Sequence, residues 1–337
     1  MYDVITIGSN TYDVFVKTEA EVRQVIQHIT TNGETKQIND KSIVYPVGDK
    51  ILINHLDFQI GGGGTNCAVA FSKLNLKTGY IGKIGKDDNG VKVYSLLKNE
   101  DVDFLGALGD QTGFSVILDS VADDRTILTS KGCSNDLKYN ELDLSEVKTK
   151  MLYCSSMMGD SFNTMTKLIQ KFKKQGSLIA FNPSLYVASD KKTISLLKYL
   201  DILVFNKEEA FALSNKNDLE DAFVWLAKKV KGIIVITDGK HGVYALKDDT
   251  LYFAKPSSNL KIVETTGAGD AFASGFSAGI LLNKDLKECL KRGMIEAEAV
   301  IQYYGAKTYL LSEKQLLTKL KKDKREITIK KLRGVKK

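Results

Sequence analysis

Two kinds of hydrophobic pattern alternate along most of the chain. Short runs rich in β-branched residues predict buried strands, and longer stretches with apolar residues every three or four positions predict amphipathic helices. The predicted strands are residues 4–7, 78–81, 151–154, 178–181, 202–205 and 233–237. The predicted helices are residues 66–74, 91–98, 162–174, 192–197, 219–229 and 268–282. This order predicts an α/β fold of three layers (α/β/α), in which helices cover both faces of a mostly parallel central sheet.

Two stretches, 14–60 and 104–130, depart from this pattern. Both contain little helix signal, and apolar and polar residues alternate instead over 13–17, 42–47, 50–56, 114–119 and 125–130. Such alternation between turn residues is typical of hairpin strands. We expect a small β-sheet lid over a cleft; the alternative is that these strands extend the main sheet. The expected α/β body comprises residues 1–13, 61–103 and 131–313.

The composition is that of an ordinary globular protein. Of 337 residues, 43% are hydrophobic and 26% are charged, which is enough for a large buried core. The net charge of +7 arises at the end of the chain, because segment 314–337 alone carries more positive charge than the whole. We expect a solvated basic helix followed by a frayed end there. A nucleic-acid-binding tail is the less favoured interpretation.

Several protein classes are disfavoured by the cysteines, the histidines and the apolar segments. The four cysteines form no Cys-x-x-Cys pair, and the three histidines have no metal-ligand spacing. A zinc enzyme, a Ser-His-Asp hydrolase and a disulfide framework are therefore not expected. The first residues show no signal-peptide pattern, and the most apolar helix, of about a dozen residues, is too short to span a membrane. These features favour a cytoplasmic protein without a membrane partner.

The strongest candidate for chemistry is Val-Glu-Thr-Thr-Gly-Ala-Gly-Asp at residues 263–270. A strand predicted at 261–264 leads into the two glycines, and a helix follows them. Amide groups at such a helix start carry a partial positive charge that suits a phosphate group. Asp270, in the first turn, is placed to accept a hydroxyl proton. The alternative is an ordinary helix with an acidic residue in its first turn.

A second candidate is Gly-Gly-Gly-Gly-Thr-Asn at residues 61–66. Bare glycine backbone lets a ligand approach closely, and Asn66 adds a donor and an acceptor. A flexible hinge is the alternative. Two weaker motifs each follow a predicted strand: Asn206 to Glu209, which suits a hydrated Mg²⁺, and Thr-Asp-Gly-Lys-His-Gly at 237–242. Structural capping explains either one alone. The chain contains no phosphate-binding P-loop and no dinucleotide-binding fingerprint after its first strand.

Taken together and in this order, the four motifs resemble those of the ribokinase-like (PfkB) carbohydrate kinases. The resemblance extends from Gly8 to about Ala306 and includes Ile-Gly-Lys-Ile-Gly-Lys-Asp-Asp-Asn-Gly at 81–90. It implies a ribokinase-like fold with a lid, and transfer of the γ-phosphoryl group of ATP to a small carbohydrate, with Mg²⁺ bound beside ATP. It also makes a homodimer through the lid plausible.

The resemblance implies a role for individual residues. Asp270 is expected to be the catalytic base, and the amides of Gly267, Ala268 and Gly269 are expected to form an anion hole. The expected substrate-binding residues are Asp13, Gly63, Gly64, Asn66 and, from the lid, Arg125. The expected ATP-binding residues are Asn206, Thr237, Gly239 and Gly242, with Glu209 at the Mg²⁺ end.

Departures from the family pattern concern the substrate and a second cation. Ribokinases usually carry Lys and Ala where this chain has Gly63 and Thr65, which puts ribose in doubt. Glu264 replaces an Asp at a position associated with monovalent cations, so activation by K⁺ stays open. The alternatives are a nucleoside kinase on the same scaffold and a non-catalytic sugar- or nucleotide-binding regulator. The second has no need of a base such as Asp270.

Overall fold

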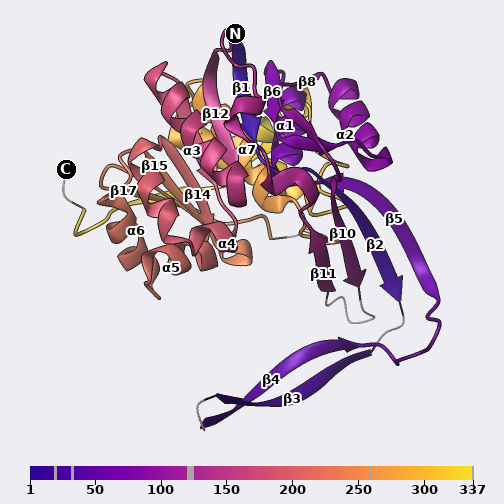
Figure 1. The fold of residues 1–337 in the computed structure, drawn as a ribbon. Helices are drawn as coiled ribbons and strands as arrows, with labels where there is room; N and C mark the ends of the chain where they lie inside the picture. The colour runs from indigo at the N-terminus through magenta and orange to yellow at the C-terminus, as the bar shows by residue number, and fades with distance from the viewer. Residues whose placement is uncertain (19–20, 32–33, 120–124, 259, 336–337) are drawn as a thin grey trace.

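A large, mostly parallel sheet forms the centre of the molecule (Figure 1). The structure, a computed structural model, describes residues 1–18, 21–31, 34–119, 125–258 and 260–335. Within these ranges the large sheet has ten strands in the order β18-β17-β16-β15-β14-β13-β12-β1-β6-β8. From β15 to β8 neighbouring strands run parallel, whereas β15 to β18 pair antiparallel.

The strands of the large sheet include all six that the hydrophobic pattern predicts. Their bounds are β1 (Tyr2–Ile7), β6 (Thr78–Ile81), β8 (Val102–Phe104), β12 (Thr149–Ser155), β13 (Leu178–Asn182), β14 (Ile202–Asn206), β15 (Ile233–Thr237), β16 (Val243–Lys247), β17 (Thr250–Ala254) and β18 (Ile327–Lys331). The α-helices are α1 (Gly63–Lys73), α2 (Asp88–Asn99), α3 (Gly159–Lys174), α4 (Leu185–Ala188), α5 (Lys207–Ser214), α6 (Leu219–Ala227), α7 (Ala268–Leu281), α8 (Leu286–Val300) and α9 (Glu313–Lys322).

Alternate side chains of the buried strands enter two separate cores, which confirms the three-layer prediction. In β1, Ile5 and Ile7 pack with α3, α5 and α6, whereas Val4 packs with α1, α7 and α8 on the other face. Strand β12 alternates in the same way, with Leu152 in the first core and Tyr153 in the second. Because a strand presents successive side chains to opposite faces, both faces of the sheet are covered.

The predicted lid strands form a sheet of their own rather than an extension of the large sheet. Its order is β11-β10-β2-β5, with bounds β2 (Thr11–Thr18), β5 (Ile53–Gly61), β10 (Gly113–Asp119) and β11 (Arg125–Ser130). Strands β3 (Glu21–Thr31) and β4 (Glu34–Val44) pair with each other as a ribbon beyond the ends of β2 and β5 (Figure 1). The short strands β7 (Lys83–Gly85) and β9 (Ala107–Gly109) form a further parallel pair.

Three local predictions are wrong. Residues 261–264 are not a strand, because the amides of Val263 and Glu264 donate to the carbonyl of Ile301 at the end of α8 rather than to a neighbouring strand. The helix predicted at 192–197 is a 3₁₀ segment, Lys191–Tyr199. The segment after α9 is not a frayed end, since β18 pairs with β17 along the sheet edge. Strands β16 and β17 were not predicted at all.

No helix in the described ranges is long and apolar enough to cross a membrane.

The first turn of α1 lies directly against the end of β1 because both segments lack side chains at the contact. A Cβ atom on Gly8 would lie 2.7 Å from the Cα of Gly64 and 2.8 Å from the Cβ of Ser155. The amide of Gly64 donates to the carbonyl of Ser9 (3.1 Å), and Thr6 Oγ1 donates to the carbonyl of Gly64 (3.1 Å). The glycine-rich segment is therefore a fixed part of the fold and not only a hinge.

We expect Gly8→Ala to lower the free energy of unfolding by about 1–3 kcal/mol, because the added methyl group overpacks a contact between two backbones. Chemical denaturation measures this loss. Gly269→Ala is the comparison, since a Cβ atom there meets no atom within 4 Å. Equal stability of the Gly8→Ala variant and the unmodified protein would show that the β1–α1 contact can relax.

Candidate active site

The base of the candidate site is the bare backbone of Gly61–Gly64, with a carboxylate on each side. A Cβ atom on Gly61 would lie 1.9 Å from Asp13 Oδ2, and one on Gly63 would lie 3.4 Å from Asp270 Oδ1. Side chains at these two positions would therefore collide with Asp13 at Gly61 and with Ser155 at Gly63, beside Asp270. The structure thus brings together the two acids that the sequence predicts for the substrate and the base.

Asp13 offers an acceptor that no protein group uses. It lies on β2, opposite Gln59 on β5 and Ser115 on β10. Its Oδ1 is buried and has no hydrogen-bond partner among the described residues. Burial raises the pKa of Asp13, and the hydroxyls of Ser115 and Thr11 and the charges of Lys307 and Lys131 oppose this rise. A buried acceptor without a donor is uncommon in proteins and suits a ligand hydroxyl group.

Asp270 is held by two consecutive residues of α1. Its Oδ2 accepts a hydrogen bond from Asn66 Nδ2 (2.8 Å), and Cys67 Sγ lies 3.8 Å from Oδ1. Burial raises the pKa of Asp270, whereas the Asn66 bond, the charge of Lys307 and Cys67 lower it. The carboxyl group is therefore oriented by α1 and is a stronger base than an ordinary surface aspartate.

Lys307 is a site residue that the sequence motifs do not predict. Its ammonium group donates to the carbonyl of Ile60 and to Asn66 Oδ1. Burial lowers the pKa of Lys307 to about 8, although the charges of Asp13 and Asp270 oppose this. A lysine thus lies beside the glycine motif even though the motif itself contains none. The preceding residue, Ala306, explains the placement: a Cβ atom on Gly267 would lie only 2.4 Å from the Cβ of Ala306.

The start of α7 presents backbone amides beside Asp270. Gly267 caps the helix in a left-handed conformation with φ of 79°, which glycine adopts without strain. The first i→i−4 bond runs from Ala271 to Gly267 (2.9 Å), and the amide of Ala268 donates to Thr265 O (3.2 Å). The amides of Gly267, Gly269 and Asp270 precede that first helical bond and have no partner inside the helix. Gly269 faces open space.

A cavity of about 510 Å³ extends from this helix start toward β15. Thr237, Gly239, Ala268 and Gly269 line it, together with apolar side chains of α7 and α8 such as Phe272 and Met294. A neighbouring cavity of similar volume, about 510 Å³, is lined by Asn206, Thr237 and Gly239. Gly242 lines neither cavity; its φ of 121° and the 2.6 Å from a Cβ atom there to Ala254 O indicate a structural need for glycine.

Asn206 and Glu209 form a capping box at the start of α5. Glu209 N donates to Asn206 Oδ1 and Asn206 N donates to Glu209 Oε2, both at 2.8 Å. Burial raises the pKa of Glu209 to about 7, and the negative charge of Asp270 adds to this effect. Within the described residues no three acidic, histidine or cysteine side chains form a metal site. Glu209 and Asp270 are close enough for the charge of one to affect the other, and a role for Glu209 toward Mg²⁺ stays a prediction.

Two further predicted positions are Glu264, before α7, and Arg125, at the start of β11. Glu264 Oε2 accepts a hydrogen bond from the amide of Gly305 (3.0 Å), which ties the segment before α7 to the loop that carries Lys307. Its role toward K⁺ stays a prediction. Arg125 begins β11, but its side chain lies outside the described part of the structure, so its contact with substrate also stays a prediction.

Comparison with known protein families matches residues 29–313 to the description "pfkB family carbohydrate kinase". The chain belongs to the pfkB family. Among curated relatives, an uncharacterized sugar kinase of Archaeoglobus fulgidus is 29% identical over 250 residues, which covers 71% of this chain and 97% of the relative. A 5-dehydro-2-deoxygluconokinase of Bacillus licheniformis is 27% identical over 268 residues, which covers 73% and 82%.

The fold of this pfkB-family chain is also found in solved structures. The nucleoside kinase of Methanocaldococcus jannaschii, described as an archaeal member of the ribokinase family, superposes with a TM-score of 0.77 at 20% identity. The match covers 95% of this chain and 99% of the nucleoside kinase. This likeness confirms the ribokinase-like fold, and at this identity it carries no information about the substrate.

Replacing Gly269 with alanine separates stability from activity in this family member. Alanine is a better helix residue than glycine, so we expect Gly269→Ala to raise the free energy of unfolding by about 0.5–1 kcal/mol. We expect the same methyl group to enter the open side of the helix start and to displace the phosphate group predicted there, so that turnover falls by about 10²-fold. Thermal denaturation and steady-state kinetics measure the two effects. Unchanged turnover would place the anion elsewhere.

Proposed function

We propose that this pfkB-family chain transfers the γ-phosphoryl group of ATP to a hydroxyl group of a small sugar or sugar acid. The observation that carries the proposal is the position of Asp270. Its carboxylate is oriented by Asn66 at 2.8 Å, lies next to the bare backbone of Gly63, and belongs to the first turn of α7. A base and an anion-binding helix start thus belong to the same helical turn, and phosphoryl transfer to an alcohol requires both.

On the acceptor side, Asp13 and Asn66 bind and orient the substrate. The unpartnered Oδ1 of Asp13 accepts a hydrogen bond from one hydroxyl group. Gly63 and Gly64 let the first turn of α1 pack against Ser155 and Gly8, which holds Asn66 in place beside Asp270. A second hydroxyl group then lies near Asp270, which accepts its proton as the oxygen attacks phosphorus. Closure of the lid sheet excludes water, the competing acceptor.

On the donor side, the adenosine part of ATP occupies the cavity lined by Thr237, Gly239 and Phe272. The phosphates extend to the start of α7, where the amides of Gly267 and Gly269 bind the negative charge that develops on the phosphoryl oxygens. Glu209, at the start of α5, is the candidate to hold Mg²⁺. When bound, Mg²⁺ would neutralise charge on the β- and γ-phosphates.

The aromatic side chains of the lid favour a sugar over a nucleoside. A nucleoside kinase needs an aromatic or apolar surface for the base, and Tyr12, Phe58 and Phe114 are the obvious candidates. They stack on one another at centroid distances of 6.0 and 6.4 Å. Tyr12 is adjacent to Asp13 in β2, so its side chain leaves the opposite face of the sheet. On the lid face that carries Asp13, the polar residues Gln59 and Ser115 are its neighbours on the adjacent strands, which suits hydroxyl recognition.

A homodimer through the lid is part of the same proposal. Phe58 and Leu128 lie on the lid face that points away from Asp13 and are 52% and 57% exposed. An exposed apolar face of this kind is a common contact surface between protein chains. A second copy of the chain could cover it.

We expect Asp270→Asn to lower turnover by about 10²–10⁴-fold, because the amide cannot accept the hydroxyl proton. ATP affinity should stay within a factor of about two, since the α7 amides remain. ADP formation with pentoses, hexoses, keto-deoxy sugar acids and nucleosides is the measurement. Asp221→Asn, an exposed acid in the first turn of α6, is the matched control. Near-normal turnover of Asp270→Asn would refute the base, and turnover with nucleosides alone would refute the sugar substrate.

The charge of Lys307 should set the pH at which Asp270 becomes active. Burial raises the pKa of Asp270, and Lys307 and Asn66 oppose this rise. The negative charge of Asp270 in turn raises the pKa of the neighbouring acid Glu209. Without the ammonium group the pKa of Asp270 rises, so the base stays protonated to higher pH. We therefore expect Lys307→Met to move the acidic limb of the kcat–pH profile upward.

Lys307 itself loses its proton near pH 8, so its charge acts on Asp270 throughout the acidic range in which this limb lies. Kinetics at saturating substrate from acidic to neutral pH locate the limb in both proteins. Lys314→Met, an exposed residue of α9, controls for the loss of one positive charge. An acidic limb that does not move in Lys307→Met would show that the ammonium group does not act on Asp270.

A further inference from the structure

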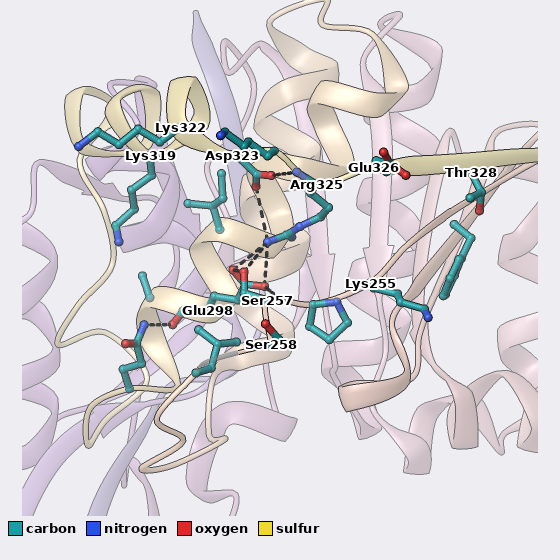
Figure 2. A pocket seen from close by; sticks show the side chains of 17 residues that line it. Lys255, Ser257, Ser258, Glu298, Lys319, Lys322, Asp323, Arg325, Glu326 and Thr328 are labelled. Carbon is teal, nitrogen blue, oxygen red and sulfur yellow. Dashed lines mark hydrogen bonds and ion pairs between the residues drawn. The ribbon is translucent and has the colours of Figure 1, made fainter.

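The loop after β17, residues 255–258, is a partition between two cavities. On one side lies the cavity of about 510 Å³ assigned above to ATP, and on the other a cavity of about 790 Å³ (Figure 2). Lys255, Pro256, Ser257, Ser258 and Glu298 line both. A loop with open space on both sides gains little from close packing. Its position therefore depends on polar contacts.

Glu298 of α8 binds the loop through Ser257. The amide of Ser257 donates to Glu298 Oε1 (2.9 Å), and Ser257 Oγ donates to Oε2 (3.0 Å). Both carboxylate oxygens are thus used by one residue of the partition. A carboxylate in this position needs a positive partner, because its side chain is only 14% exposed.

Arg325 supplies that partner from the end of the chain. Its Nη2 lies 2.9 Å from both oxygens of Glu298 and donates to Ser257 Oγ at 3.1 Å. The side chain is 7% exposed, so water does little to screen the ion pair. Figure 2 shows Arg325 reaching from the C-terminal segment to Glu298 and Ser257.

The C-terminal segment is itself anchored on both sides of Arg325. Before it, the carbonyl of Asp323 accepts a hydrogen bond from Lys291 of α8 (3.3 Å). After it, β18 pairs with β17, with Ile327 opposite Ala254. Ala254 is the last residue before the partition. The chain end therefore fixes the strand from which the loop departs as well as the carboxylate that holds the loop.

We propose that Arg325 is a positioning residue for the nucleotide site: through Glu298 and Ser257 it holds the partition in the place where it forms the wall for ATP. The proposal rests on the proposed function, which puts ATP in that cavity. Arg325 does not touch the nucleotide or the reacting atoms. Arg325 determines the fraction of molecules in which the wall is in place. If that fraction falls tenfold, the apparent affinity for ATP also falls tenfold.

The test compares nucleotide affinity with the chemistry. Arg325→Gln and Ser257→Ala each remove part of the contact, and we expect the Kd for a non-hydrolysable ATP analogue to rise, by about tenfold if the wall is in place a tenth of the time. The kcat at saturating ATP and the KM for the sugar should not change. Lys330→Gln is the control, because Lys330 pairs with Glu220 at the surface.

The variants also distinguish positioning from loss of the fold. If Arg325→Gln fails to fold because the buried acids Glu298 and Asp323 lose their positive partner, the triple variant Arg325→Gln, Glu298→Gln and Asp323→Asn restores the fold but not the nucleotide affinity. Unchanged analogue binding in Arg325→Gln and Ser257→Ala overturns the role of Arg325. A fall in kcat and a rise in the KM for the sugar, each as large as the rise in the Kd for the analogue, would also overturn the role of Arg325. An unmodified protein that binds no ATP analogue overturns the proposed nucleotide site instead.

Discussion

The hydrogen bond between Asn66 and Asp270 joins helices α1 and α7, and the site depends on both. Asn66 belongs to α1, which follows the lid strand β5, and Asp270 belongs to α7, which lies on the same face of the large sheet. The bond is possible only because α1 begins at glycines that let its first turn lie against β1. Any change in how α1 rests on the sheet therefore changes the orientation of the carboxylate.

Charge balance is the second constraint on this site. Asp13, Asp270 and Glu209 are acids whose pKa values are raised by burial. Lys307 is a buried cation that opposes the rise in the first two. Ionised acids placed this close repel each other, so a cation is required if the base is to be ionised near neutral pH. With all four groups ionised the site carries a net negative charge, which favours a bound cation.

Much of the fold and the main motifs could be predicted from the sequence, because they depend on local signals. Hydrophobic periodicity located six of the seven parallel strands of the large sheet, and glycine clusters located the turns at Gly62 and Gly267. Lys307 could not be found this way, since its place depends on the contact of Ala306 with Gly267, far away in sequence. The same holds for β18, whose short, basic, exposed sequence becomes a strand only because β17 offers an open edge. Gly242 matched its motif, yet its conformation and contacts give it a structural role.

The basic end of the chain has a further consequence, for aggregation. Strand β18 is the last strand of the large sheet in the described residues, so its outer backbone groups could pair with the sheet of another molecule. Lys330 and Lys331 lie on this strand and are exposed, paired only at the surface with Glu220 and Asp249. Bringing two such edges together would place these charges against each other. The positive charge of the C-terminal segment thus opposes pairing between the β18 edges of two molecules.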